Sequence, residues 1–223
     1  MDRKIPLKTH QHYHLMTKSI AGYVIFNNDR EFTRMISMMR FYQYQDLPLS
    51  FSHFFYEVEQ QNQNFSQRLS EVSQNRQRLI RILAYCLMST HLHFIVQQLC
   101  DDGISRFMNN LLNSYTRYFN TSHHRKGPLW QGRFKSVHVE TDEQLLHLTR
   151  YLHLNPISAG LVNQPEQWLY SSYREYLQRV DPEQKLCGYE HVLDVNPPYY
   201  AKFVEDRKDY QRLLAKIKHL LME

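Results

Sequence analysis

The feature that most constrains this chain is a pair of β-rich runs separated by only two residues. Arg81–Met88 and His91–Leu99 are rich in branched and aromatic residues, and Ser89-Thr90 lies between them. So short a link can join antiparallel strands, whereas parallel strands need a crossover of about a dozen residues or more. The sequence therefore predicts an antiparallel β-hairpin in the middle of the chain.

Further extended segments flank this hairpin. Tyr13–Ile20 and Arg133–Glu140 have the composition and alternation of strands, and a third extended stretch is expected around Phe51–Val58. Together with the hairpin, these segments supply enough strands for one small sheet.

Three helices are predicted from apolar residues that recur at steps of three and four. Their expected caps are Asn28 or Asp29, Asp101 or Asp102, and Thr141. Thr141 and Gln144 have the spacing of a capping box, and Pro156 is expected to end the helix that they begin. Strands and helices in this order predict an α+β fold: a ferredoxin-like antiparallel sheet with helices packed on it.

Two segments fall outside that plan. A Gln-rich stretch at about residues 59–79 keeps one apolar helical face and is expected to be a helical insertion. Residues 179–223 are expected to form a helical C-terminal extension, broken at Pro197-Pro198 and ending in an amphipathic helix over Tyr210–Leu221. The predicted main domain therefore covers residues 1–178.

Composition excludes several classes of protein. A hydrophobic fraction of 42% with 22% charged residues is that of a globular chain, not a disordered one. Three cysteines without a CxxC pair favour neither a disulfide framework nor a cysteine-based zinc site. No apolar run approaches the roughly 18–20 residues that cross a bilayer, and Met1–Lys8 lacks the apolar core of a signal peptide. We therefore expect a cytoplasmic protein.

Positive charge is concentrated in one segment. The chain carries 27 Lys and Arg against 22 Asp and Glu, a net charge of +5, yet Gly103–Val139 alone contains six basic and no acidic residues. Aromatic side chains are interleaved with these cations, a combination that binds phosphates and unpaired bases. The alternative is a solvated basic face. The candidate nucleic-acid contacts are Arg125, Lys126, Trp130, Gln131, Arg133 and Lys135.

Two histidines share one face of a predicted strand. Side chains alternate along a strand, so His91 and His93 point the same way, and two neutral imidazoles can hold a divalent metal if a third ligand is available. The alternative is a pair of half-exposed surface histidines. His10, His12 and His14 alternate in the same manner, so spacing alone does not choose between the two sets.

A tyrosine lies on one stripe of the helix that begins at Thr141. His147, Tyr151 and Asn155 recur four residues apart, which places them above one another on the same face. A phenol can attack phosphorus when its oxygen is activated, and an amide oxygen one turn later can bind a metal. The alternative is that Tyr151 packs on the sheet and Asn155 merely ends the helix.

These motifs, taken in order, resemble the single-tyrosine HUH transposases, which include the IS200-like and REP-associated tyrosine transposases. The resemblance covers roughly residues 10–177. It rests on Tyr13-His14, Ala84-Tyr-Cys-Leu-Met-Ser-Thr-His-Leu-His93, Gly127-Pro-Leu-Trp-Gln-Gly-Arg-Phe-Lys135, Tyr151-Leu-His-Leu-Asn-Pro156 and Trp168-Leu-Tyr-Ser-Ser-Tyr173. One departure is Ser89-Thr90, which stands where the family often has Pro-Asn before the histidine pair.

The resemblance implies a nuclease and transposase that cleaves and rejoins single-stranded DNA, with residues 1–178 as its catalytic domain. Tyr151 would form a 5′-phosphotyrosine intermediate, while His91, His93 and Asn155 would bind Mg²⁺ or Mn²⁺. The implied partner is single-stranded or hairpin DNA, at palindromic repeats, bound by a monomer or homodimer in the nucleoid.

Two other functions are compatible with the same residues. The sheet and the basic segment would also suit a regulator that binds hairpin nucleic acid without cleaving it. A third possibility is a metalloenzyme acting on small substrates through His10, His12 and His14.

Overall fold

The computed structural model describes residues 6–207, so the amphipathic helix predicted over Tyr210–Leu221 lies outside the described residues. The chain forms two compact units, each assembled from separate segments. One contains Thr17–Arg81 and Gln97–Phe134 with the segment that ends at Gln11, and the other contains His12–Met16, Ile82–Val96 and the segment that begins at Lys135. The predicted boundary at residue 178 stays a prediction.

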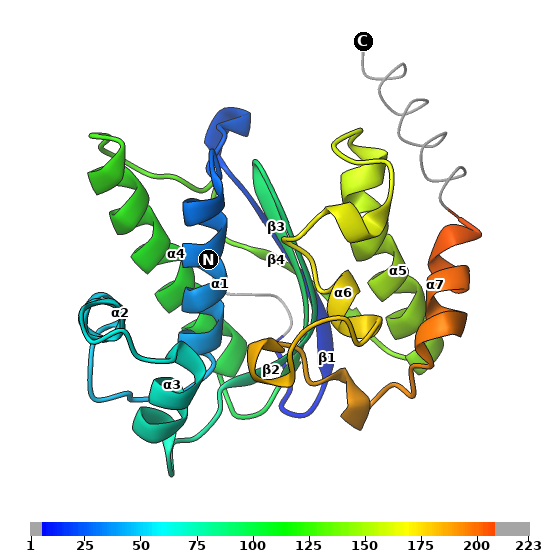
Figure 1. Ribbon diagram of the computed structural model, residues 1–223, viewed down its shortest axis with the longest axis horizontal. Coiled ribbons are helices and arrows are strands. Elements are labelled where there is room, and N and C mark those ends of the chain that lie inside the picture. Colours follow the sequence, from blue (N-terminus) through cyan, green and yellow to red (C-terminus); the bar gives the residue numbers. More distant parts are fainter. Residues whose placement is uncertain (1–5, 208–223) are drawn as a thin grey trace. The chain divides into compact units, whose positions relative to one another are not determined.

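Four strands form one sheet, most of which belongs to the second unit. They are β1 (His12–Lys18), β2 (Ile80–Met88), β3 (His91–Gln98) and β4 (Lys135–Val139), in the spatial order β2-β3-β1-β4. Strands β1 and β4 are antiparallel, with His14 opposite Val137. The element order β1-α1-β2-β3-α4-β4-α5 confirms the predicted α+β, ferredoxin-like fold and its central hairpin (Figure 1).

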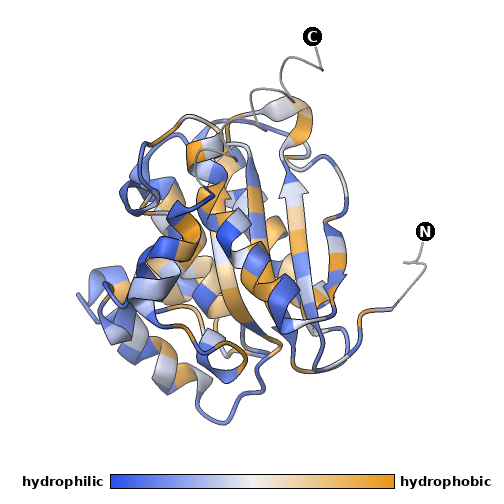
Figure 2. Ribbon diagram, turned by 90° about the vertical axis from the view of Figure 1, so that its right-hand side faces the viewer, coloured by the Kyte–Doolittle hydropathy of each residue, from blue (hydrophilic) through white to orange (hydrophobic). Residues whose placement is uncertain are grey.

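The first unit contains the helices α1 (Asp29–Tyr42), α2 (Phe51–Gln60), α3 (Phe65–Ser73) and α4 (Gly103–Ser122). Helices α1 and α4 lie side by side (Figure 1). Hydrophobic residues form bands along the helical ribbons, separated by hydrophilic ones (Figure 2), and the apolar bands supply buried side chains such as Met35, Phe107 and Leu111. Burial of these faces is what stabilises such amphipathic helices.

The expected extended stretch at Phe51–Val58 is wrong, because these residues form helix α2. Ser50 Oγ accepts a hydrogen bond from His53 N (3.3 Å) and caps the helix. The buried residues Phe51, Phe54 and Val58 recur at steps of three and four, which is helical spacing. The insertion helix α3 also ends earlier than expected, at Ser73.

The second unit contains α5 (Asp142–Ser158), α6 (Tyr173–Tyr176) and α7 (Pro197–Glu205), with α5 and α7 in contact (Figure 1). The predicted cap of α5 is confirmed, since Thr141 Oγ1 accepts from Gln144 N at 3.1 Å. Short 3₁₀ turns complete the described chain: Ile20–Gly22, Pro165–Gln167, Pro182–Gln184 and Tyr189–His191.

Both proline predictions are wrong. Pro156 does not end α5, which continues to Ser158; a proline so close to the helix end removes only the bond to the Leu152 carbonyl. Pro197-Pro198 begins α7 instead of breaking the chain, because proline has no N–H to satisfy in the first turn. Asn196 caps that turn by accepting from Tyr199 N at 3.3 Å.

No helix in residues 6–207 is both long and apolar enough to span a membrane. The three cysteines, Cys86, Cys100 and Cys187, are free thiols.

Helix α4 starts where two backbone segments come unusually close. Asp102 occupies the N-cap position, but its φ of 58° is left-handed and its side chain makes no cap hydrogen bond. A Cβ added to the next residue, Gly103, would lie 2.2 Å from the Leu79 carbonyl oxygen. Only glycine fits between the start of α4 and this backbone.

We therefore predict that Gly103→Ala destabilises the protein by about 1–3 kcal/mol, because the new methyl group forces the backbone at Leu79 to move. Urea unfolding of the two proteins measures this difference. At an open helical position alanine would stabilise instead, so a variant more stable than the parent chain would contradict the proposed close approach.

Candidate functional site

Strand order brings a third histidine to the predicted pair. Because β1 lies next to β3, His14 lies beside His93, with His14 Nε2 3.1 Å from His93 Nδ1. The two rings stack at 5.3 Å and 15°, and the His91 ring lies 5.1 Å from the His93 ring. The sequence placed His14 in an alternating run but gave it no role at the site.

Tyr151 reaches the same histidines from helix α5. Its ring centroid is 6.0 Å from that of His93 and 6.3 Å from that of His14, and both contacts are edge-on. Tyr151 is 38% exposed, whereas His93 is only 3% exposed. The structure thus brings His91, His93 and Tyr151 together within the second unit, with the phenol on the accessible side.

Burial shifts the pKa values of His14 and Tyr151. It lowers the pKa of His14 below its ordinary value of 6.5, so that ring is neutral at neutral pH. Burial, together with the nearby Cys86 thiol, raises the pKa of Tyr151 above 10.0. Because the phenol is protonated at neutral pH, its oxygen needs a partner that accepts the proton or stabilises the developing charge.

The donor set of the two predicted metal ligands fits a divalent ion. Thr90 Oγ1 lies 3.0 Å from His91 Nδ1, and His14 Nε2 lies 3.1 Å from His93 Nδ1. Nδ1 of each ring is therefore engaged within the protein. Metal-binding histidines are typically held through one nitrogen in this manner while the other binds the ion, so Nε2 is the candidate ligand atom in each ring.

Asn155, the third predicted ligand, has unused hydrogen-bonding capacity. Its Nδ2 atom is buried without a hydrogen-bond partner. Nitrogen and oxygen of a side-chain amide are assigned from such partners, so either atom can occupy that position. Within residues 6–207, no three His, Cys, Asp or Glu side chains form a group able to hold a metal. A metal at the pair would therefore need the amide of Asn155 or oxygens from a substrate.

The alternative histidine set does not form such a group. His10 is exposed in a turn with φ 66° and belongs to the first unit, whereas His12 and His14 lie on β1 in the second. Of the three, His14 is the one whose ring contacts His93 and Tyr151.

The predicted nucleic-acid contacts are distributed over both units. Lys126, Gln131 and Arg133 are exposed in the first unit, and Lys135 is exposed in the second. Arg125 holds its own loop by donating to Pro128 O at 2.7 Å.

Trp130, also in the first unit, is anchored to helix α4. Its Nε1 donates to Leu112 O (3.2 Å) and to Thr116 Oγ1 (3.0 Å). These hydrogen bonds fix the indole along α4, so its ring can contact a ligand only in this orientation.

The helix that carries Tyr151 is tied to the sheet through His153, two residues later. Ser172 Oγ lies 2.8 Å from His153 Nε2 and accepts a hydrogen bond from Tyr85 N of β2 (3.0 Å). The ring is fully buried, and burial lowers the pKa of His153 to about 3. It is therefore neutral, with one ring nitrogen donating and the other accepting.

The other nitrogen of His153 ties α5 to α7. Nδ1 lies 2.7 Å from Tyr200 Oη, which donates in turn to Thr149 Oγ1 at 2.9 Å. Because the Tyr200 hydroxyl donates to Thr149, Nδ1 carries the ring proton and donates to Tyr200 Oη, and Nε2 accepts from Ser172 Oγ. Every buried polar atom in this chain of bonds is thus satisfied, and α5 is held from two sides.

The Trp168–Tyr173 motif also packs against β2. Trp168 Nε1 donates to Leu87 O (3.0 Å), Leu87 N donates to Tyr170 O (2.9 Å), and Cys86 and Ser171 form a β-bridge. This motif therefore extends the sheet beyond β2 and positions Ser172 for His153.

We predict that stability falls as the pH is lowered from 6.5 towards 3, and that His153→Gln flattens this dependence. The folded chain excludes the proton that an unfolded histidine binds, so acid favours unfolding, by at most about 1.4 kcal/mol per pH unit from this group. Thermal melting at several pH values measures the slope.

His10→Gln, at an exposed histidine, is the matched control and should keep the parent slope. Equal slopes for His153→Gln and the parent chain would exclude His153 as the buried titrating group.

Comparison with known proteins agrees with these motifs. The model of the family described as "Transposase IS200 like" matches residues 53–155. A curated Haemophilus influenzae protein, named as a REP-associated tyrosine transposase, is 27% identical over 112 residues, which cover 45% of this chain and 64% of that protein. The family match confirms the resemblance predicted from the sequence, and the aligned residues span 64% of the curated relative's length.

One solved structure is also similar. It is a REP-associated tyrosine transposase bound to a REP hairpin, with a TM-score of 0.47, 18% identity, and coverage of 88% of this chain and 95% of that one.

Proposed function

We propose that this chain, whose residues 53–155 match the IS200-like transposase family, cleaves and rejoins single-stranded DNA through Tyr151. The observation that carries the proposal is the convergence of Tyr151 with His91, His93 and His14 from three separate elements. An accessible phenol beside the buried His93 ring and the neutral His14 ring suits attack on a phosphodiester.

The reaction is a transesterification. Tyr151 Oη forms a bond to phosphorus and loses its proton, while the bond to the 3′-oxygen breaks and that oxygen leaves as a hydroxyl. The product is a 5′-phosphotyrosine link, which conserves the energy of the phosphodiester. Attack by a 3′-hydroxyl on this link reverses the step and rejoins DNA.

A divalent ion, if bound, would supply stabilisation of negative charge on the scissile phosphate. We infer that His91 and His93 would hold Mg²⁺ or Mn²⁺ through Nε2, and that the side-chain amide of Asn155, whose Nδ2 atom is buried without a hydrogen-bond partner, would add an oxygen ligand. The raised pKa of Tyr151 makes such charge stabilisation necessary, since a neutral phenol is a weak nucleophile.

His14 is a positioning residue in this proposal. A single proton is shared between His14 Nε2 and His93 Nδ1 at 3.1 Å, since both rings cannot donate to each other. Only when His93 donates does its Nε2 carry a lone pair for a metal. His14 therefore needs to act as acceptor, which its neutral state allows.

Hairpin DNA at palindromic repeats is the substrate that the motif resemblance favours. Basic residues of the 103–139 segment, among them exposed Lys126, Arg133 and Lys135, would neutralise its phosphates. A regulator that binds the same DNA without cleaving it is the competing function, and the next experiment separates the two.

Tyr151→Phe is expected to abolish the covalent protein–DNA adduct and leave DNA binding within about twofold, because one hydroxyl of an exposed ring contributes little to binding. Labelled single-stranded and hairpin DNA is incubated with Mn²⁺, and the products are separated on a denaturing gel.

Tyr199→Phe, at an exposed tyrosine of α7, is the matched control and should form the adduct normally. An adduct that persists in Tyr151→Phe would exclude this nucleophile, and a parent chain that binds without any adduct would favour the regulator.

His14→Leu is expected to weaken Mn²⁺ binding about 10- to 100-fold, because His93 loses the acceptor that fixes its proton on Nδ1. His14→Gln retains an acceptor oxygen and should recover most of that affinity. Calorimetric titration of the DNA-free protein measures both.

His12→Gln, two residues earlier on the same strand, is the control and should bind Mn²⁺ as the parent does. Equal affinities for His14→Leu and the parent would show that His14 does not position His93.

A further inference from the structure

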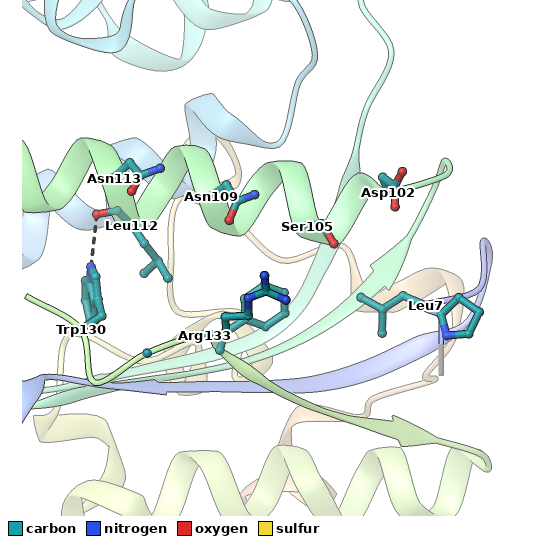
Figure 3. Close-up of a pocket in the computed structure, with 11 residues that line it drawn as sticks. Leu7, Asp102, Ser105, Asn109, Leu112, Asn113, Trp130 and Arg133 are labelled. Carbon is teal, nitrogen blue, oxygen red and sulfur yellow. Dashed lines mark hydrogen bonds between the residues drawn. The ribbon is translucent and has the colours of Figure 1, made fainter. Parts of the chain in front are cut away.

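A groove in the first unit runs along one side of helix α4. Its volume is about 590 Å³, within the range of about 300–1,000 Å³ that is usual for small-ligand sites. Figure 3 shows the groove. Its lining is completed by Pro6 and Leu7 and by four residues of the 130–134 segment: Trp130, Gly132, Arg133 and Phe134. It lies entirely within one unit and contains none of the histidines or tyrosine described above.

One wall of the groove is a row of polar side chains. Ser105, Asn109 and Asn113 recur four residues apart on α4 and project along the same side of the helix (Figure 3). Within the described part of the chain, the side-chain amides of Asn109 and Asn113 make no hydrogen bond. Each amide therefore presents two donors and an acceptor to whatever enters.

The remaining lining combines apolar and charged groups. Leu112 and the anchored ring of Trp130 close one end, and Leu7 and Asp102 lie towards the other, while Arg133 lies across from α4 (Figure 3). Phe134 also lines the groove. The lining thus offers flat apolar surface, amides, one carboxylate and one guanidinium.

We propose that this groove binds an unpaired nucleobase of a single-stranded DNA segment, an inference that rests on the proposed function. Asn109 and Asn113 would bond the polar edge of the base, as asparagine does with adenine, and Leu112, Trp130 or Phe134 would contact its face. Arg133 would pair with the adjoining phosphate.

The shape and charge of the groove favour this ligand over two others. A helix that reads paired bases inserts into the major groove and must protrude, whereas the amide face of α4 is the wall of a hollow. Asp102 in the lining would repel a bare phosphate group, but its carboxylate can accept from the amino group of a base.

Asn109→Ala tests the proposal, with Asn110→Ala as the matched control. Both are exposed asparagines on the same helix, but only Asn109 lines the groove. The probes are a fluorescent hairpin oligonucleotide with a single-stranded flank and the same molecule with its flank made duplex. Asn109→Ala should bind the single-stranded probe about tenfold more weakly, and the fully duplex probe equally well.

A set of probes with one abasic nucleotide at each flank position identifies the bound base, because an abasic site keeps the phosphate. At one position, the abasic probe should bind the parent chain about tenfold more weakly, and Asn109→Ala should then cause no further loss. Melting temperatures of both variants, expected to equal that of the parent, verify that the exposed substitutions leave the fold intact.

The outcomes separate the two proposals. If the parent forms the Tyr151 adduct but Asn109→Ala binds single-stranded DNA as Asn110→Ala does, the groove assignment is overturned and the nuclease proposal stands. The groove assignment is also overturned if, at every flank position, the loss of affinity caused by Asn109→Ala adds to the loss caused by the abasic site. If the parent neither binds nor cleaves single-stranded DNA, both proposals fail together.

Discussion

The position of β1 inside the sheet, between β3 and β4, decides which side chains can meet at Tyr151. It places His14 against His93 at hydrogen-bonding distance, although the two residues are far apart in the chain. If β1 did not lie next to β3, His93 Nδ1 would need another partner. The geometry of the proposed metal ligands thus depends on the order of the strands as much as on the histidines themselves.

Helix α5 carries out two tasks on opposite faces. Its exposed side presents Tyr151, and its buried side is bonded through His153 to both β2 and α7. A nucleophile on a loop would lose precision through motion, whereas this one is on a helix whose buried His153 is hydrogen-bonded through both ring nitrogens. Tyr200 of helix α7 is therefore part of the support for the nucleophile.

Local patterns predicted much of this arrangement. The alternation around His91 and His93 and the spacing of Tyr151 and Asn155 identified these side chains, because each pattern depends only on a single strand or helix. His14 was left without a role because its contact depends on strand order, although a ferredoxin-like topology could have pointed to it. The helix at Phe51–Val58 was predicted as a strand because aromatic residues occur in both strands and helices. The groove lined by the α4 amides could not be predicted, because it exists only where α4 packs beside the 130–134 segment.

The Trp168–Tyr173 motif has one more consequence. Strand β2 is the outermost strand of the sheet on its side, and an outer strand exposes unpaired N–H and C=O groups that invite pairing with another molecule. By bonding to Tyr85 and Leu87, this motif occupies those groups from within the same chain. The protein is thereby protected on that side from edge-to-edge aggregation.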